Sequence, residues 1–353
     1  MEKVLMKGNE ALAEAAIMAG CRHFFGYPIT PQTEVAAYMA KRMPKLEGGG
    51  TYLQAESEIA AINMVIGAAA AGKRVLTSSS SPGISLKAEG ISYLAGCDLP
   101  AVIINVQRGG PGLGGIQPSQ ADYFQATRPG HGDFHLIALA PNSVQEMVDL
   151  TVRAFDLADE YRITVMLLAD GILGQMMEPV ELRAAAPRAL PAKDWAATGT
   201  ANGRKKNIVN SLYLKPEELE KTVFARFARY AQIAEKETLY EEYMTDDAEI
   251  VIVAYGAASR ISKNAIAAAR AKGIKAGMVR PITLWPFPTA PVAALVDKAK
   301  CFLSVEMSMG QMIEDVKLAV NGKKPVYLCN RTGGMVPTPE EILAKIEEAM
   351  GVQ

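Results

Sequence analysis

The sequence predicts an α/β protein made of two doubly wound domains. From residue 8 to about residue 182, amphipathic helical runs alternate with short β-branched runs, and a second alternation starts at residue 248. This alternation is typical of a parallel sheet with helices packed on its faces. The length of 353 residues also favours about two domains, because a single hydrophobic core rarely grows that large.

The first unit is predicted to contain four helices and four strands. Its helices carry apolar residues three or four positions apart, and its strands are short apolar runs bounded by Gly, Pro or Ser. In chain order the predicted elements are helix 9–20, strand 21–28, helix 31–43, helix 57–72, strand 73–81, strand 101–108, helix 143–161 and strand 164–170. The strand at 73–81 is expected to run into a polar loop, TSSSSPGIS, at 77–85.

The segment from 183 to 245 differs in composition from the units on either side. It begins with Pro and Ala, continues through GTANGRKKN and ends in a charged helical run at 215–244. We expect domains at 1–190 and 246–353, joined by a linker and an arm-like helix at 191–245. In the second domain the predicted elements are strand 248–256, helix 261–273, strand 275–280, helix 290–300, strand 301–306, helix 309–320 and strand 324–329.

Charge and composition exclude several classes of protein. The 37 Lys and Arg residues nearly balance the 38 Asp and Glu residues, which leaves no basic excess to neutralise a nucleic-acid backbone. No run of about 18 apolar residues predicts a membrane span, and the N-terminus lacks the apolar region of a secretory signal. We therefore predict a cytoplasmic protein that binds neither nucleic acid nor membrane.

The cysteines do not predict a metal site in this chain. Cys21, Cys97, Cys301 and Cys329 are far apart and form no C-x-x-C pair, and only three histidines accompany them. This spacing matches neither a structural zinc site nor an iron–sulfur cluster. Each cysteine is expected to be a small buried apolar residue.

The stretch GYPITPQTE at 26–34 follows a predicted strand and contains two prolines three residues apart. Pro31 suits the first turn of a helix, where its missing N–H costs nothing, and Thr30 would then be the N-cap. The free N–H groups and the positive dipole end of such a helix also attract anions. We expect a helix start here, with an anion as a compatible ligand.

Arg108 ends the strand 101–108 and precedes the glycine-rich motif GPGLGG at 110–115. The motif has the formal G-x-G-x-x-G spacing, but Pro111 and the following IQPSQ delay any helix, so we do not predict a dinucleotide fingerprint. Three polar loops, GYPITP, TSSSSPG and QRGGPGLGG, follow strands of the same predicted sheet. Because such strand ends converge on a ligand crevice, we expect Thr30 and Arg108 to meet there.

Glu58 begins the Ala-rich helix 57–72, and Glu56 precedes it by two residues. Acidic residues in a first helical turn complement the helix dipole, and this role alone explains both side chains. The helix has almost no polar face, however. A carboxylate at its start would be partly desolvated and suited to sharing a proton.

In these stretches the sequence resembles the α subunits of 2-oxoacid:ferredoxin oxidoreductases, most of all the branched-chain type that acts on 3-methyl-2-oxobutanoate. The residues that carry the resemblance are GYPITPQTE, ESEIAAINMVIGAAAAGKRVLTSSSSPGISLKAEGISYLAGCDLP and VIINVQRGGPGLGG. The resemblance extends over nearly the whole chain. It implies an N-terminal domain that binds the pyrimidine of thiamine diphosphate and a C-terminal domain like that of transketolase.

The resemblance also implies roles for four residues. Glu58 has the position of the activating glutamate, which hydrogen-bonds N1′ of the aminopyrimidine so that N4′ can remove the thiazolium C2 proton. Pro28 and Glu58 are implied to contact the cofactor. Thr30 and Arg108 are implied to bind the carboxylate of the 2-oxoacid.

The reaction implied is oxidative decarboxylation of a 2-oxoacid, with coenzyme A as the acyl acceptor and ferredoxin as the electron acceptor. The chain lacks a Gly-Asp-Gly motif with paired asparagines about 25 residues later, and it lacks cluster cysteines. The resemblance therefore implies a β subunit that holds the magnesium and the diphosphate. Iron–sulfur clusters are implied in partner subunits only, among which are a ferredoxin-like subunit and a γ subunit.

The sequence leaves two alternatives open. The chain could be a subunit of the same family that acts on 2-oxoglutarate or pyruvate, because the residues that shape the substrate pocket lie partly on loops. It could also be a non-catalytic α/β binding module in which Glu58 only caps a helix.

Overall fold

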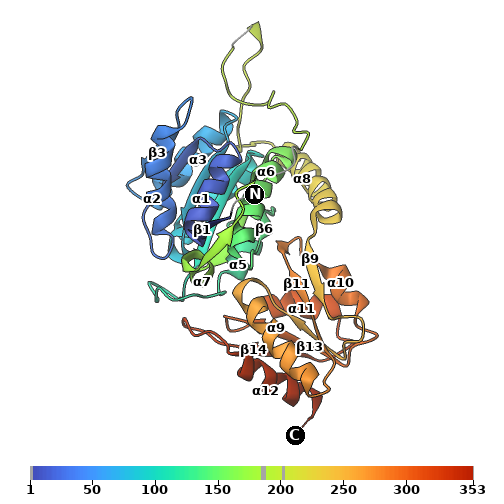
Figure 1. Ribbon diagram of the computed structural model, residues 1–353. Coiled ribbons are helices and arrows are strands. Elements are labelled where there is room, and N and C mark those ends of the chain that lie inside the picture. Colours follow the sequence, from blue (N-terminus) through green and yellow to red (C-terminus); the bar gives the residue numbers. More distant parts are fainter. Residues whose placement is uncertain (1–2, 184–187, 201–202, 353) are drawn as a thin grey trace.

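The computed structural model describes residues 3–183, 188–200 and 203–352 of the chain. Two α/β domains are visible in Figure 1, the first coloured blue to green and the second orange to red. Each is built on a mainly parallel sheet with helices on both faces. The predicted fold class is confirmed.

The described elements alternate along the chain as follows. The strands are β1 (Val4–Lys7), β2 (His23–Gly26), β3 (Thr51–Gln54), β4 (Val75–Ser79), β5 (Ala101–Gln107), β6 (Ile137–Leu139), β7 (Thr164–Asp170), β8 (Met177–Val180), β9 (Tyr240–Tyr243), β10 (Ile250–Val253), β11 (Ala276–Pro281), β12 (Thr283–Trp285), β13 (Cys301–Glu306) and β14 (Val326–Asn330). The helices are α1 (Gly8–Met18), α2 (Thr33–Arg42), the short η1 (Met43–Lys45), α3 (Glu58–Ala70), α4 (Ser81–Gly96), α5 (Tyr123–Thr127), α6 (Val144–Tyr161), α7 (Gly171–Gln175), α8 (Pro216–Glu237), α9 (Gly256–Ala271), α10 (Thr289–Ala294), α11 (Met312–Val320) and α12 (Pro339–Met350).

The first domain contains a seven-stranded sheet in the order β12-β6-β7-β5-β4-β2-β3. Its strands pair in parallel except for the edge strand β12, which runs antiparallel to β6. The strands β2, β4 and β5 are neighbours, so their carboxyl ends lie side by side. In doubly wound sheets this edge is where ligands bind.

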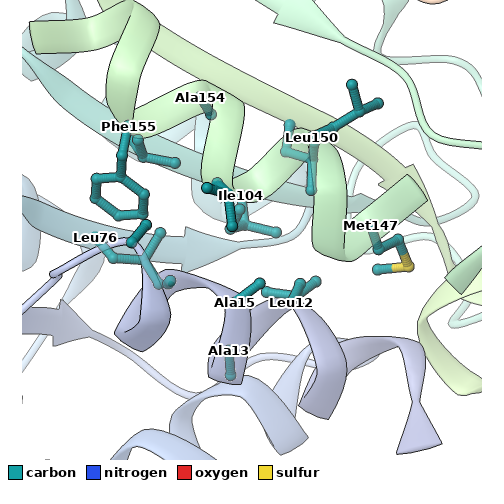
Figure 2. Close-up of a cluster of buried hydrophobic side chains, with 14 of the residues drawn as sticks. Leu12, Ala13, Ala15, Leu76, Ile104, Met147, Leu150, Ala154 and Phe155 are labelled. Carbon is teal, nitrogen blue, oxygen red and sulfur yellow. The ribbon is translucent and has the colours of Figure 1, made fainter. Parts of the chain in front are cut away.

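Two hydrophobic cores lie on opposite faces of this sheet, and alternating residues of the central strands point into one or the other. Leu76 and Ile104 face the helices α1 and α6, where they meet Leu12 and Phe155 (Figure 2). Ile103 and its neighbours on the other side of the sheet face α3 and α4. Strands buried on both faces read as continuous apolar runs, which explains why the sequence pattern identified them.

The second domain contains a five-stranded sheet in the order β14-β13-β10-β11-β9, with only the edge strand β9 antiparallel. The helices α9 and α12 pack on one face, and α10 and α11 pack on the other. The core between α3, α4 and the first sheet continues into this domain through Tyr123, Tyr255 and Phe302. The two domains therefore share a continuous apolar interior, and β12 carries the chain of the second domain back to the first sheet.

The helix α8 lies beside the first domain in Figure 1 and is not free of it. Tyr230 and Ile233 on its buried face join the core formed with α1 and α6. Arg226 of α8 donates from Nε to a carboxylate oxygen of Asp98 at 3.0 Å. Glu237 accepts from Arg153 at 2.6 Å. These contacts hold α8 along the first domain.

The predicted N-cap at Thr30 is wrong. Thr30 and Pro31 lie in a turn that is closed by the Gln32 N–H, which donates to the Ile29 carbonyl at 3.1 Å. The helix α2 begins only at Thr33, and no side chain caps it. Proline marked the correct turn, but the chain needs two more residues to enter the helix.

The predicted polar loop TSSSSPGIS is also wrong. Strand β4 ends at Ser79 and helix α4 begins at Ser81, with Pro82 in its first turn. A serine before proline is a helix-start signal, and the Gly83 N–H donates to the Ser80 carbonyl at 2.7 Å. The strand therefore passes directly into a helix, and this brings α4 against the strand ends of the first sheet.

The cysteines are not paired. Cys21, Cys301 and Cys329 are buried as expected, whereas Cys97 is partly exposed. Within the described parts of the chain, no three His, Cys, Asp or Glu side chains are grouped so that they could hold a metal ion. No helix in these parts is long and apolar enough to cross a membrane.

Candidate active site

Glu58 is the first residue of α3 and is almost completely buried, with 6% of its surface exposed. It does not cap the helix, because Ser57 does so by accepting the Ala60 N–H at 3.1 Å. Among the described residues, no donor forms a hydrogen bond or an ion pair with the Glu58 carboxylate. The carboxylate oxygens keep some contact with solvent at this largely buried position, so they are open to a ligand, and this marks Glu58 as a candidate functional group.

The first turn of α4 packs directly against Glu58. A Cβ added at Gly83 would lie 2.7 Å from Oε1 of Glu58 and 2.1 Å from Oγ of Ser79. Only glycine therefore lets the strand end and the carboxylate approach each other here. The Oγ atoms of Ser79 and Ser80 are buried and have no hydrogen-bond partner. Several polar groups without partners thus lie at the end of β4.

Arg108 and Thr30 are brought together, as the convergence of strand ends predicts. Arg108 is 7% exposed and donates from Nη1 to the Thr30 carbonyl at 2.9 Å. Its Nη2 donates to the Leu113 carbonyl at 3.1 Å, and its buried Nε has no partner among the described residues. The guanidinium is therefore held in place by two backbone carbonyls, and its Nε–H has no acceptor in the described parts of the chain.

The glycines of GPGLGG fold this loop back on itself. The Gly115 N–H donates to the Gly109 carbonyl at 2.8 Å. Gly114 has a φ of +58°, and a Cβ there would lie 1.9 Å from that same carbonyl oxygen. The glycines thus allow the loop to approach its own backbone closely, and this brings the Leu113 carbonyl to Arg108.

Three polar residues that sequence reasoning missed hold the backbone of Arg108. Ser81 accepts the Arg108 N–H at 3.1 Å and donates its own proton to Oδ2 of Asp122 at 2.6 Å. Asn105 donates to the same oxygen at 3.0 Å. Burial raises the pKa of Asp122, although these hydrogen bonds and the charge of Arg108 oppose the rise. Ser81 has a φ of +22°, a rare conformation for serine that places its hydroxyl between the strand ends.

A cavity of about 510 Å³ lies beside Thr30. Its other lining residues are Pro31, Thr33, Glu34, Ile116, Gln117, Pro118, Gly171, Ile172 and Gln175. No lysine or arginine is among them. Pro28 is exposed and comes two residues after the end of β2, so it also lies at this edge of the sheet.

Lys87 is a second buried ionisable group that sequence reasoning missed. It is 0% exposed, and its Nζ donates to Oγ1 of Thr77 at 3.0 Å. Burial lowers the pKa of Lys87 to about 8, while the charge of Glu58 acts in the opposite direction. The sequence signal was absent because a single lysine in a helix is most often a solvated charge.

Comparison with known proteins assigns both domains to one family. Residues 14–245 match the family described as pyruvate flavodoxin/ferredoxin oxidoreductase, thiamine diphosphate-binding, and residues 248–342 match the pyruvate:ferredoxin oxidoreductase core domain II. The chain is 52% identical over 352 residues to the ketoisovalerate oxidoreductase subunit VorB of Methanothermobacter marburgensis, a match that covers 99% of both chains. The chain is an α-type subunit of the 2-oxoacid:ferredoxin oxidoreductase family. Within this family it is 38% identical to the 2-oxoglutarate synthase subunit KorA of the same organism, over 98% of each chain.

Solved structures place this 2-oxoacid:ferredoxin oxidoreductase subunit in the same fold. The 2-oxoglutarate:ferredoxin oxidoreductase from Magnetococcus marinus, solved with 2-oxoglutarate, coenzyme A and succinyl-CoA bound, matches with a TM-score of 0.89 and 29% identity. The match covers 99% of this chain and 65% of that one. A split-gene transketolase with 13% identity and a TM-score of 0.62 shares the fold alone.

The contact between Gly83 and Glu58 generates a prediction about stability. Gly83→Ala should destabilise the chain by about 1–3 kcal/mol, because the new methyl group overlaps Ser79 and Glu58 and forces them apart. Gly67→Ala is the matched control. Gly67 also lies in a helix, but nothing lies within 4 Å of a Cβ there, so alanine should stabilise the chain by about 0.5–1 kcal/mol.

Urea denaturation of the full chain measures both changes. If Gly83→Ala is as stable as Gly67→Ala, the first turn of α4 does not pack against Glu58 as described.

Proposed function

We propose that this chain supplies the pyrimidine half of the cofactor site in a thiamine-diphosphate-dependent 2-oxoacid:ferredoxin oxidoreductase. The observation that carries the proposal is the Glu58 carboxylate, which is buried at the sheet edge without a donor among the described residues. A ring nitrogen that can carry a proton would complete its hydrogen bonding. The family to which residues 14–245 belong is described as binding thiamine diphosphate, which supports this choice of ligand.

The residues at this edge fit the aminopyrimidine end of the cofactor. Bound thiamine diphosphate supplies the carbon nucleophile for decarboxylation of a 2-oxoacid. Glu58 would hold the proton at N1′ of the aminopyrimidine, and Pro28 would contact the cofactor from the end of β2. Because most of the Glu58 side chain is shielded from water, its hydrogen bond to N1′ would be stronger than the same bond in solution.

Arg108 and Thr30 are proposed to bind the carboxylate of the 2-oxoacid. The Nε of Arg108 is a buried donor without a partner, which makes it suited to an anion. Thr30 is exposed at the mouth of the 510 Å³ cavity, and its carbonyl already fixes the guanidinium of Arg108. The carboxylate would therefore meet a donor that is oriented before the substrate arrives.

The remaining parts of the reaction are proposed to lie on other chains. A β subunit would hold the magnesium ion and the diphosphate, because the sequence has no Gly-Asp-Gly motif with paired asparagines. Iron–sulfur clusters would lie in partner subunits, among them a ferredoxin-like subunit and a γ subunit. Coenzyme A would accept the acyl group and ferredoxin the electrons, in the cytoplasm where both occur.

The substrate that we propose is 3-methyl-2-oxobutanoate. Greater identity to the ketoisovalerate oxidoreductase subunit than to the 2-oxoglutarate synthase subunit supports this substrate. We further propose that the cavity beside Thr30 takes the side chain of the substrate. Its lining has an acidic Glu34, an apolar Ile116 and no Lys or Arg for the second carboxylate of 2-oxoglutarate, and the nearby Lys7 is already paired with Glu34 at 3.5 Å. Pyruvate is the second candidate, since its small side chain needs no cation either.

Glu58→Gln in the assembled complex should leave assembly intact and lower kcat by about 100- to 10,000-fold, because an amide cannot share a proton with N1′. Glu56→Gln is the control. Glu56 is exposed and precedes the helix, so its change should have little effect. Steady-state reduction of ferredoxin with 3-methyl-2-oxobutanoate measures both variants. Equal losses in the two variants would contradict the role given to Glu58.

Arg108→Ala should lower kcat/KM for the 2-oxoacid by about 10- to 150-fold, the loss expected for a hydrogen bond to a charged group. Thr30→Val should cost less, because valine keeps the backbone carbonyl that Arg108 binds. Cofactor affinity should change little in either variant. An Arg108→Ala complex with unchanged kcat/KM would show that this arginine does not bind the substrate.

Across a panel of 2-oxoacids, the assembled complex should have its highest kcat/KM with 3-methyl-2-oxobutanoate. 2-Oxoglutarate should be at least about tenfold poorer, because a second carboxylate would be buried without a cation. Initial rates of ferredoxin reduction at matched coenzyme A concentration measure the order. A preference for 2-oxoglutarate would overturn the assigned substrate while leaving the reaction class intact.

A further inference from the structure

The helices α3 and α4 pack along a seam that encloses Lys87. On α4, Gly83, Lys87 and Gly90 are spaced by four and three residues, so they share one face of the helix. Gly83 contacts Glu58, and a Cβ at Gly90 would lie 2.6 Å from Cγ1 of Ile62. Because Glu58 and Ile62 are one turn apart on α3, Lys87 lies between two contacts with that helix.

Lys87 has far fewer partners than a buried ammonium group needs. It is 0% exposed, and its three N–H donors have one acceptor among the described residues, Oγ1 of Thr77. In those residues no carboxylate lies within ion-pair distance of Nζ. An ammonium group in such a place is stabilised mainly by a negative charge at somewhat longer range.

Glu58 is the negative charge that the surrounding elements provide. It is the only ionisable residue of α3, and the strands β4 and β5 contain none. Asp170 at the end of β7 is engaged as the cap of α7, where it accepts the N–H groups of Ile172 and Leu173. Glu89 on α4 is exposed and accepts from the Tyr93 hydroxyl.

We propose that Lys87 is the buried counter-charge of Glu58, a positioning residue whose positive charge favours a carboxylate that accepts a hydrogen bond from a protonated ring nitrogen. The proposal rests on the proposed function for its role in the reaction. The charge coupling itself is a property of this chain without cofactor. Removing the positive charge of Lys87 would make a negative charge on Glu58 less favourable and would weaken this arrangement.

The coupling has a consequence for stability that is measurable without cofactor. Because burial lowers the pKa of Lys87 to about 8 from its ordinary value of 10.5, the folded chain releases this proton at a lower pH than the unfolded chain. Between these two values the unfolded chain binds more protons, so Lys87 makes stability rise with pH. Below about pH 8 Lys87 is protonated in both the folded and the unfolded chain, so this gain in stability is absent.

The test compares urea midpoints of the cofactor-free full chain from pH 6 to pH 11 in wild type, Lys87→Met, Glu58→Gln and the double variant. The difference between wild type and Lys87→Met isolates the rise due to Lys87. Glu58→Gln should move the onset of that rise to lower pH by about one unit or more, because it removes the charge that favours protonated Lys87. An onset that is the same in wild type and in Glu58→Gln would overturn the proposal.

Two further measurements keep the test decisive. If Lys87→Met does not fold, the test rests on comparing the pH at which stability begins to rise in Glu58→Gln and in wild type. This comparison remains valid because Glu58→Gln is isosteric and breaks no described hydrogen bond. In the assembled complex, Lys87→Met should move the acid limb of the kcat–pH profile to higher pH, whereas Glu89→Gln should leave it unchanged. A loss of kcat that is equal at every pH would indicate a structural role and overturn the proposal.

The outcomes separate this inference from the proposed function. If the chain alone shows the coupled onset but Glu58→Gln leaves the activity of the complex unchanged, the function given to Glu58 fails and the charge pair stands. If Glu58→Gln abolishes activity but the onset does not move, the function stands and the role of Lys87 fails.

Discussion

The site depends on one constraint, the burial of the Glu58 carboxylate at the start of α3 without a hydrogen-bond donor among the described residues. Removing an ionised carboxylate from water is costly, and the dipole at the start of α3 offsets only part of that cost. The neighbouring structure must therefore hold it in place. Gly83 allows α4 to close over the side chain, and we propose that the buried Lys87 is its counter-charge. The same burial limits the water that competes for the position where a ligand nitrogen would bind.

The topology brings the other site residues to this carboxylate. Because β2, β4 and β5 are neighbours, Thr30, Ser81 and Arg108 leave the sheet at one edge. Ser81 and Asp122 fix the backbone of Arg108, and Thr30 fixes its guanidinium. The second domain stabilises the same edge, since the core behind α3 and α4 continues into it. The arrangement thus depends on both domains, although the site residues all come from the first.

The sequence was sufficient to predict the alternating strands and helices of the α/β class. It was insufficient to predict elements that form only through packing between distant parts of the chain. Buried parallel strands such as β5 are continuous apolar runs, so the α/β class could be predicted from pattern alone. Helix α4 could not be predicted in this way, because Gly83 and Gly90 are poor helix formers. Their role, which is to let α3 pack closely on α4, is visible only in the structure. Lys87 was missed because a single lysine is most often a solvated charge, and its burial depends on the packing of α4 against α3. Glu58, Thr30 and Arg108 were singled out because they stand at strand or helix ends, whereas the start of α2 depended on a turn at Ile29–Gln32 that the prolines did not specify.

The central claim is that Glu58 is buried without a partner because a thiamine ring nitrogen provides one. The most direct measurement is an experimental structure of the assembled complex with thiamine diphosphate bound. The account predicts a carboxyl oxygen of Glu58 within about 2.6–3.2 Å of N1′ of the aminopyrimidine, in the side-chain position described for the chain alone. A bound cofactor whose N1′ meets another residue, with Glu58 bonded to protein or turned toward solvent, would contradict it.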